Sequence, residues 1–380
     1  MGLPVFQKHS KERAGALMDY FRFARDSDAY MTYVIINPQA DRNKSTGEQQ
    51  DEFLATGVVD EDAEGITVRG AKMLGTGSIM ANEVLFANIQ PLKPGEEKYA
   101  ISFAIPMNTK GLKVMSRRSY EESATSSFDY PLSSRFDEND ALVYCDDVKV
   151  PWERVFIYKD TDTARGQFQD TYAHYMQNYQ AMIRLMVKMQ FQIGVARRMC
   201  ETIGTVGMPP VAEKLGHMAA QAAMVEGLVY GMESGGGEFN GYYVPDRNLM
   251  YTAQVLTQQL YPEFITSMRE LAGGGLIMLP SSAEDFADPE LNKYINATQK
   301  SAIGSAEEKV KLMKLAWDSI GSEFASRHTQ YEMFYAGAQF VTRGHAMRTY
   351  DWERSSDLVD SILDKYSLSD TIGGDKIAAE

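Results

Sequence analysis

The chain has 380 residues, of which 44% are hydrophobic and 24% charged, so it can bury a large core and form more than one domain. Its formal net charge of -14 makes nucleic acids and anionic membranes poor partners, because both are themselves negatively charged. Only two cysteines occur, Cys145 and Cys200, which argues against a disulfide framework and favours a reducing cytoplasm.

The N-terminal segment, residues 1–32, is expected to be helical. Ala14, Leu17 and Phe21 repeat at helical spacing among charged residues. This spacing predicts one or two short helices between residues 6 and 30.

Residues 33–160 are expected to form β structure. Short apolar runs recur there with turn residues between them, and several contain alternating or β-branched residues, as expected of strands. Residues 91–97 and 137–140 are polar and are expected to be exposed loops. The predicted strands are Tyr33–Ile36, Gly65–Val68, Val84–Ile89, Tyr99–Pro106, Leu112–Met115, Ala141–Tyr144 and Val148–Val150.

After the strand region the apolar residues repeat at helical spacing. One apolar stripe runs from Met182 to Ala196. A second helix is predicted to begin at Pro209, because proline needs no backbone donor in a first helical turn. A third opens with Ser305 and Glu308, which have the spacing of a capping box. The residues after Ser367 predict an irregular tail.

The familiar catalytic motifs are absent from the sequence. The run Gly75-Thr76-Gly77-Ser78-Ile79-Met80 begins like a dinucleotide-binding turn, but its last position is Met and no βαβ unit surrounds it. An ordinary β-turn is the favoured interpretation, and a loop whose backbone approaches a ligand closely is the alternative. The five histidines show no metal-ligand spacing, so we expect no metal and leave the chemistry to an organic cofactor.

Two stretches carry a family resemblance. The first reads YPLSSRFDENDA at Tyr130–Ala141 and continues as VKVPWERV at Val148–Val155. The second reads WDSIGSEF at Trp317–Phe324 and is followed by Arg327-His328 and Tyr335-Ala336-Gly337. Both resemble the large (oxygenase) component of the 4-hydroxyphenylacetate 3-monooxygenase family, and weaker matches follow the same order along the chain.

The resemblance implies an α+β, acyl-CoA dehydrogenase-like fold. It places a central β-barrel domain at residues 33–160 and a C-terminal helical bundle at residues 161–380, usually within a homotetramer. Residues 1–32 would be the remnant of an N-terminal helical domain. We therefore expect an N-terminally shortened member, which is a fragment, a chain completed by a separate chain, or a reduced form.

The resemblance also implies the chemistry. A flavin reductase supplies reduced FAD, molecular oxygen adds at the flavin C4a position, and the hydroperoxide transfers one oxygen atom to a phenolic substrate ortho to its hydroxyl group. The protein's task is to exclude water and orient the phenol. This makes the chain a cytoplasmic flavoprotein monooxygenase of aromatic compound catabolism.

The family's flavin contacts transfer to positions of this sequence. Tyr33 is also the expected catalytic residue, because the family often has a histidine there that hydrogen-bonds the phenol oxygen. Tyrosine can donate this bond but is a poor base near neutral pH. Arg42 suits the pyrophosphate charge, although Asp41 and Arg42 alone would be a surface ion pair. The expected cofactor-binding residues are Tyr33, Val34, Ile35, Gln39, Ala40, Asp41, Arg42, Thr76, Gly337, Ala338 and Gln339.

The substrate side is expected to be less complete. Residues Leu92–Glu97 match a family segment that can close over substrate, and an ordinary hairpin connection fits them equally well. The family's other phenol-binding residues, an arginine and a tyrosine, belong to the N-terminal domain and have no counterpart in this sequence.

Two alternatives stay open. A truncated, non-catalytic homologue would bind flavin or only assemble with a full-length partner, which would fit the missing phenol-binding residues. The related 4-hydroxybutyryl-CoA dehydratase needs an iron–sulfur cluster held by cysteines and a histidine. Two distant cysteines do not supply such a site.

Overall fold

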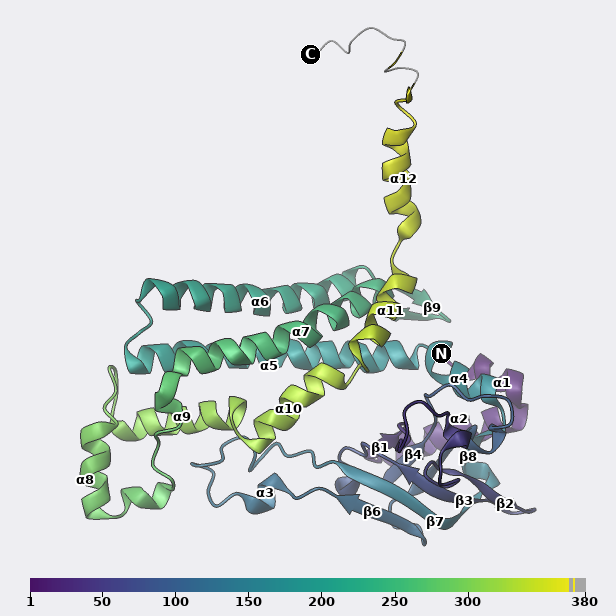
Figure 1. Ribbon diagram of the computed structural model, residues 1–380. Helices are drawn as coiled ribbons and strands as arrows, with labels where there is room; N and C mark the ends of the chain where they lie inside the picture. Colours follow the sequence, from purple (N-terminus) through teal and green to yellow (C-terminus); the bar gives the residue numbers. More distant parts are fainter. Residues whose placement is uncertain (369–371, 373–380) are drawn as a thin grey trace.

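The protein is described by a computed structural model that covers residues 1–368 and residue 372. Figure 1 shows two short N-terminal helices and the strands gathered at one end, with a layer of long helices lying along them. The predicted irregular tail after Ser367 lies almost entirely outside the described residues.

The two N-terminal helices follow the prediction for residues 6–30. They are α1 (Leu3–His9) and α2 (Lys11–Asp26). Ser10 separates them, and its hydroxyl accepts a hydrogen bond from the backbone N–H of Arg13, which caps α2. The buried Arg13 guanidinium donates to the carbonyls of Trp152 and Val155 and so attaches α2 to the strands.

The strands form two four-stranded sheets around one shared core. The first has the order β1 (Met31–Val34), β4 (Glu83–Phe86), β5 (Ile101–Pro106), β8 (Val155–Tyr158). The second has the order β2 (Gly57–Glu61), β3 (Gly65–Lys72), β7 (Ala141–Pro151), β6 (Leu112–Ser116). Between residues 1 and 368, an isolated bridge from Ile36 to Met73 links the sheets, and the pairings do not confirm the expected closed barrel.

Most of the predicted strands are confirmed, with differences that have local causes. Strands β2 and β8 were not predicted. The run predicted as two strands is one long strand, β7, which continues through the polar Asp146 and Asp147. Its register against β3 shifts between Val68 and Gly70, and Asp147 has a φ of 50°. A β-bulge therefore absorbs the two aspartates without ending the strand.

The remaining described chain is mostly helical and packs around a second core rich in methionine. The predicted start at Pro209 and the capping box of Ser305 and Glu308 are both confirmed. The helices are α4 (Thr161–Gln169), α5 (Ala173–Ile203), α6 (Pro209–Ser234), α7 (Arg247–Ala272), α8 (Pro289–Thr298), α9 (Ala306–Ile320), α10 (Glu323–Phe334), α11 (Gln339–Thr349) and α12 (Trp352–Leu363). A short helix, α3 (Tyr120–Ser123), precedes β7, and a hairpin of β9 (Gly237–Phe239) and β10 (Tyr242–Val244) follows α6.

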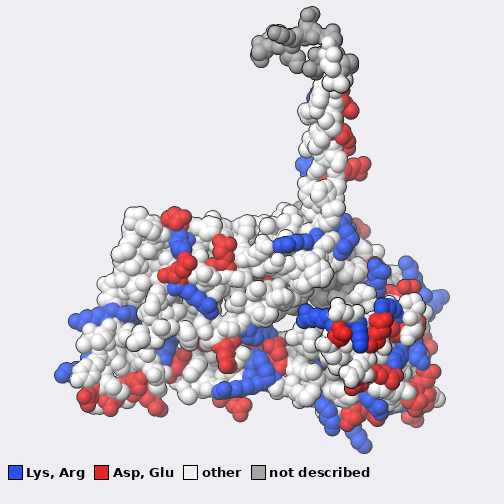
Figure 2. Space-filling view, viewed as in Figure 1, with Lys and Arg blue, Asp and Glu red and all other residues white. Residues whose placement is uncertain are grey.

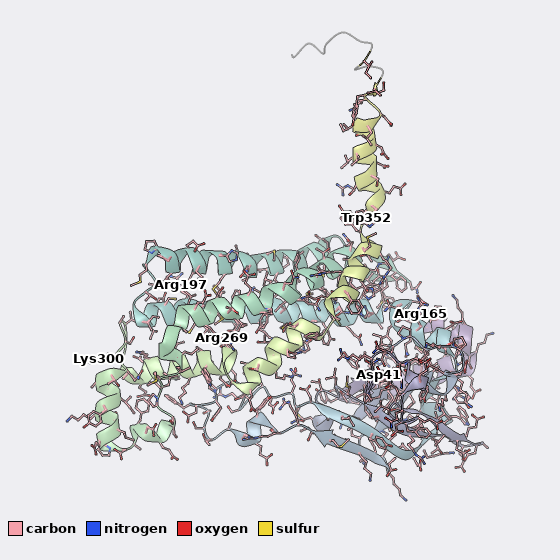
Figure 3. All side chains as sticks on the ribbon, viewed as in Figure 1. Asp41, Arg165, Arg197, Arg269, Lys300 and Trp352 are labelled. Carbon is pink, nitrogen blue, oxygen red and sulfur yellow. The ribbon has the colours of Figure 1, made fainter. Side chains whose placement is uncertain are left out.

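Helices α5, α6 and α7 form the long layer, and α10 runs between this layer and the sheets (Figure 1). Helix α12 projects away from the body, with Trp352 at its base (Figure 3). Within residues 1–368, no helix is long and apolar enough to cross a membrane. The predicted domain boundaries at residues 32 and 160 stay a prediction, although the change from strands to helices falls near residue 160.

Candidate active site

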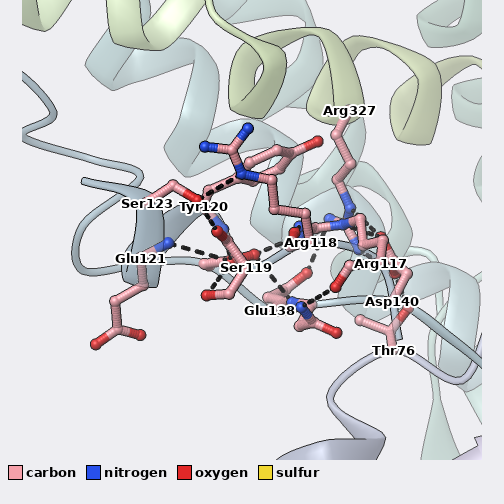
Figure 4. A network of polar contacts seen from close by, with 12 residues as sticks. Thr76, Arg117, Arg118, Ser119, Tyr120, Glu121, Ser123, Glu138, Asp140 and Arg327 are labelled. Atoms are coloured by element: carbon pink, nitrogen blue, oxygen red, sulfur yellow. Dashed lines mark hydrogen bonds and ion pairs between the residues drawn. The ribbon is translucent and has the colours of Figure 1, made fainter. Parts of the chain in front are cut away.

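The helical layer and the sheets are joined by a partly buried ionic network (Figure 4). Arg327 of α10 donates two parallel hydrogen bonds to Asp140, from Nε at 2.9 Å and from Nη2 at 2.8 Å. Its Nη1 donates to Glu138 at 3.0 Å. A bidentate arginine–carboxylate pair fixes both distance and orientation, so this network sets how α10 sits against the start of β7.

The same carboxylate holds Thr76. The Thr76 hydroxyl donates to Asp140 Oδ1 at 2.7 Å, and the Thr76 carbonyl accepts from the hydroxyl of Thr32 at 2.7 Å. Burial alone would raise the pKa of Asp140, but hydrogen bonds from Arg327 and Thr76 outweigh it and lower the pKa to about 2. Asp140 is therefore an anion at neutral pH that can only accept hydrogen bonds.

Residues 137–140 form an irregular loop as predicted and Glu138 is partly exposed, but the expected exposure of Asp137 and Asn139 is wrong. The Asp137 side chain is only 2% exposed, and it accepts hydrogen bonds from Arg117 at 2.5 Å and from the backbone N–H of Tyr120 at 2.6 Å. Asn139 is also buried, and its side chain donates to the carbonyl of Arg117 at 3.0 Å. Charge alone misled the prediction, because arginines distant in sequence pair with these carboxylates.

Residues 75–80 form a turn, as the favoured interpretation predicts, and the close approach of a ligand stays a prediction. Gly77 has a φ of 71° and precedes a short 3-10 helix at Ser78–Met80. A Cβ on Gly75 would lie 3.1 Å from Val143 and 3.2 Å from Val34, so the backbone here packs directly on the sheet core. The turn thereby presents Thr76 toward Asp140.

Tyr33 lies where β1 meets α10. Its hydroxyl is 3.2 Å from the hydroxyl of Tyr335, at the end of α10. Burial, followed by the neighbouring Tyr335, raises the pKa of Tyr33, so it stays a neutral phenol over the working pH range. Its neighbour Val34 is fully buried in the sheet core, so Tyr33 lies on the opposite face of β1.

The segment Gln39–Arg42 forms a loop held by Gln49. The Gln49 side chain accepts from the backbone N–H of Asp41 at 3.1 Å and donates to its carbonyl at 2.8 Å. The Asp41 carboxylate accepts from Asn43 rather than from Arg42, so the expected ion pair between Asp41 and Arg42 is not formed. Arg42 is exposed and makes no ion pair with any described residue. Figure 3 labels Asp41 on the side of the strands that faces the helices.

A buried lysine forms a hydrogen bond at the start of this loop. Lys72 of β3 donates to the side-chain oxygen of Asn37 at 2.6 Å and to that of Asn88 at 3.4 Å. Asn37 immediately precedes the Gln39–Arg42 loop, and Asn88 precedes the loop of residues 92–97. Burial lowers the pKa of Lys72 from 10.5 to about 7. This lysine therefore connects two loops that the family resemblance assigned to the cofactor and to the substrate.

The loop of residues 92–97 connects the antiparallel strands β4 and β5. Glu96 anchors it, because its buried carboxylate accepts from Ser45 at 2.6 Å, Gly47 at 2.6 Å and Lys93 at 2.7 Å. The connection is therefore tied to residues 45–47, and its closure over a substrate stays a prediction.

The third expected segment, Gly337–Gln339, begins α11. Gly337 has a φ of 96°, and its carbonyl accepts from the side chain of Gln258 at 2.8 Å. Ala338 provides no side-chain cap, so the first N–H groups of α11 are open to an outside acceptor. Among the described residues no hydrogen bond joins this segment to Gln39–Arg42.

The structure thus brings together some of the predicted residues and leaves others apart. It unites Tyr33 with α10 and Thr76 with Asp140 and Arg327, and Figure 2 shows a hollow between the helical layer and the strands. Asp140, Arg327 and Tyr335 were not predicted as site residues. All three lie inside the stretches that carry the family resemblance, which was the available signal.

Two family models together match most of the chain. Residues 3–157 match the family model "4-hydroxyphenylacetate 3-hydroxylase N terminal", and residues 164–364 match "4-hydroxyphenylacetate 3-hydroxylase C terminal". The chain belongs to this family.

Relatives in the family have named activities. The oxygenase component of 4-hydroxyphenylacetate 3-monooxygenase from Pseudomonas aeruginosa is 35% identical over 87% of this chain. The oxygenase component of 4-nitrophenol 2-monooxygenase from a Rhodococcus species is 34% identical over 87% of the chain. The chain spans 64% of the length of each of these two relatives.

Solved structures show the same fold. The oxygenase component of 4-hydroxyphenylacetate 3-monooxygenase, solved with FAD and 4-hydroxyphenylacetate, superposes with a TM-score of 0.89 at 33% identity. That match covers 96% of this chain and 75% of the other. An archaeal 4-hydroxybutyryl-CoA dehydratase, at 20% identity and a TM-score of 0.82, and an acyl-CoA dehydrogenase from Geobacillus kaustophilus, at 12% and 0.53, share the fold.

The lowered pKa of the buried Lys72 predicts how the stability of the protein changes with pH. Between pH 7 and 10.5 the folded chain binds fewer protons at this site than the unfolded chain, so the contribution of Lys72 to stability improves as the pH rises. We expect the free energy of unfolding of the wild type, minus that of Lys72→Met, to increase between pH 7 and 9.5 in urea titrations.

The exposed Lys113 on β6 supplies the matched control. Lys113→Met should leave the pH dependence unchanged, because this side chain is in water in both states. If the free energies of unfolding of the wild type and Lys72→Met changed in parallel with pH, the pKa of Lys72 would not be lowered in the folded chain.

Proposed function

We propose that this chain acts as the oxygenase component of a two-component monooxygenase. It takes reduced FAD from a separate flavin reductase and hydroxylates a phenolic substrate ortho to its hydroxyl group. The observation that carries the proposal is the junction of Tyr33 and Thr76 with α10, in a fold that superposes on a relative solved with FAD and 4-hydroxyphenylacetate.

The residues at the junction fit a flavin. The Thr76 hydrogen is committed to Asp140, so the lone pairs of the hydroxyl remain to accept from an N–H group such as that of a reduced flavin ring. The exposed guanidinium of Arg42 and the uncapped start of α11 suit the two phosphates of FAD. We propose that all the residues expected from the family, at positions 33–35, 39–42, 76 and 337–339, contribute to this site, with Val34 acting through its backbone.

Bound reduced FAD would supply two electrons and activate molecular oxygen, so that one oxygen atom enters the phenol ring and the other leaves as water. The chain's own residues would bind and orient the reactants. Tyr33 and Tyr335 would hydrogen-bond the phenol oxygen, and the packed junction would keep bulk water away from the reacting atoms. Tyr33 is not proposed as a base, since its raised pKa keeps it protonated.

A direct test is to mix the full chain with enzymatically reduced FAD, 4-hydroxyphenylacetate and labelled oxygen gas. We expect 3,4-dihydroxyphenylacetate that carries one labelled oxygen atom, detected by mass spectrometry. Thr76→Val should lower the yield about tenfold, which is the typical effect of one lost hydrogen bond in a site.

Thr67→Val, on strand β3 and away from the junction, is the matched control and should keep the wild-type yield. If the wild type binds reduced FAD but forms no labelled catechol, the chain is a flavin-binding homologue without this activity. A chain that does not bind reduced FAD at all would contradict the whole proposal.

We further propose that the chain forms a homo-oligomer through α12. This helix buries none of its residues against the body, yet its hydrophobic side chains gather on one side. A helix of 12 residues is marginal alone in water, so its apolar face needs a cover. A second copy of this chain supplies an equivalent apolar face, and the apolar residues are Trp352, Leu358, Val359, Ile362 and Leu363.

Charge placed on this apolar face should dissociate the assembly. We expect the wild type to exceed the monomer mass by light scattering and Leu358→Glu to reduce that mass. Ser361→Glu, on the polar face of the same helix, should not change it. A monomeric wild type, or an unchanged mass for Leu358→Glu, would refute assembly through α12.

A further inference from the structure

A second arginine lies at the junction, and unlike Arg327 it has no carboxylate. Arg184 projects from α5, and two of its nitrogens, Nε and Nη2, are buried without a hydrogen-bond acceptor among the described residues. The hydroxyl of Tyr331 on α10 is buried and unpartnered in the same way. Buried polar groups normally have hydrogen-bond partners, so these unpaired donors lower the stability of the folded chain.

The surrounding charges do not neutralise Arg184. Glu332 is paired with Lys188, and the carboxylates of Asp140 and Glu138 are both paired with Arg327. The nearby His328 does not help, since burial and then the positive charges of Lys188, Arg327 and Arg184 lower its pKa to about 3. Arg184 is therefore a cation whose counter-charge is not supplied by residues 1–368.

Aromatic rings form the walls next to this charge. The Arg184 guanidinium carbon is 4.4 Å from the centre of the Tyr331 ring and 5.7 Å from that of Tyr335. Tyr335 in turn reaches Tyr33 through the 3.2 Å contact between their hydroxyls. A cation, flat apolar walls and hydroxyl groups thus lie within one small cluster that joins α5, α10 and β1.

We propose that Arg184, together with Tyr331, binds the negatively charged oxygen of a phenolate substrate and so selects the ionised form of the phenol. The inference rests on the proposed function and adds the substrate-ionising group of that site. Arginine is suited to this role, because its guanidinium stays charged and offers parallel N–H donors to an anionic oxygen.

This assignment explains how the chain could do without a base in the substrate site. Tyr33 cannot take the phenol proton, but a fixed cation favours binding of the ionised phenol, which leaves its proton in bulk water before it enters the packed junction. The anion left behind carries more electron density at the ortho carbon, where the new carbon–oxygen bond forms. The proton released balances the charge gained by the bound oxygen.

Reduced flavin is a second flat aromatic anion that an arginine could recognise. The cluster favours the phenol, because Arg184 lies against the ring of Tyr335, whose hydroxyl contacts that of Tyr33. Thr76, which is proposed to meet the flavin, is instead hydrogen-bonded to Asp140. The experiment must therefore measure the two ligands separately.

The probe is 4-nitrophenol, whose phenolate form is yellow and whose neutral form is not. Titrating it with the full chain over a range of pH gives the affinity for each form by absorbance. We expect the wild type to prefer the phenolate, Arg184→Gln to bind the phenolate about 10- to 100-fold more weakly, and Arg184→Lys to recover part of the loss. The affinity for the neutral form should change little.

Arg197→Gln on the same helix is the matched control. Arg197 pairs with Glu201 on the surface, well away from the junction in Figure 3, and its loss should leave both affinities unchanged. Melting temperatures guard against misfolding. We expect Arg184→Gln to melt at or above the wild-type temperature, because it removes an unpaired buried charge.

The two affinities distinguish a role of Arg184 in phenolate binding from a role in flavin binding. If Arg184→Gln loses affinity for reduced FAD while its preference for nitrophenolate is unchanged, the arginine serves the flavin and the inference is overturned. Equal binding of nitrophenolate by the wild type and Arg184→Gln overturns it as well. A phenolate preference that depends on Arg184, in a chain that does not bind reduced FAD, would support this inference while contradicting the proposed monooxygenase.

Discussion

The pair between Arg327 and Asp140 is the interaction on which the junction depends. Two hydrogen bonds at 2.9 and 2.8 Å join α10 to the start of β7, although the residues are 187 positions apart. The same carboxylate receives the hydrogen of Thr76, and α10 carries Tyr331 and Tyr335. One ion pair therefore sets the positions of the groups proposed to meet the flavin and those proposed to meet the phenol.

Three buried or partly buried cations near this junction differ in the groups that offset their charge. Arg327 has two carboxylates, Lys72 has only amide oxygens and a depressed pKa, and Arg184 has aromatic rings but no acceptor. A fully paired cation holds structure, whereas an unpaired one costs stability that binding can recover. The pattern of compensation thus separates groups that build the site from a group proposed to act on a ligand.

The order of the helices and strands and the family could be predicted from the sequence, whereas only part of the site could. Hydrophobic periodicity located α5, and Pro209 and the Ser305 capping box located the starts of α6 and α9, because these signals are local. The strand pairing and the burial of Asp137 could not be predicted, because partners distant in sequence decide them. Arg184 carried no sequence signal at all, since an arginine on a long helix is normally solvated.

The central claim is that flavin binds at the junction that Asp140 organises. The most direct measurement is the affinity of the full chain for reduced FAD, by anaerobic titration, in the wild type, Asp140→Asn and the exposed control Asp146→Asn. Losing the charge should free Thr76 and loosen α10, so we expect Asp140→Asn to bind about tenfold more weakly and Asp146→Asn to bind normally. Wild-type affinity in a folded Asp140→Asn variant would contradict the account.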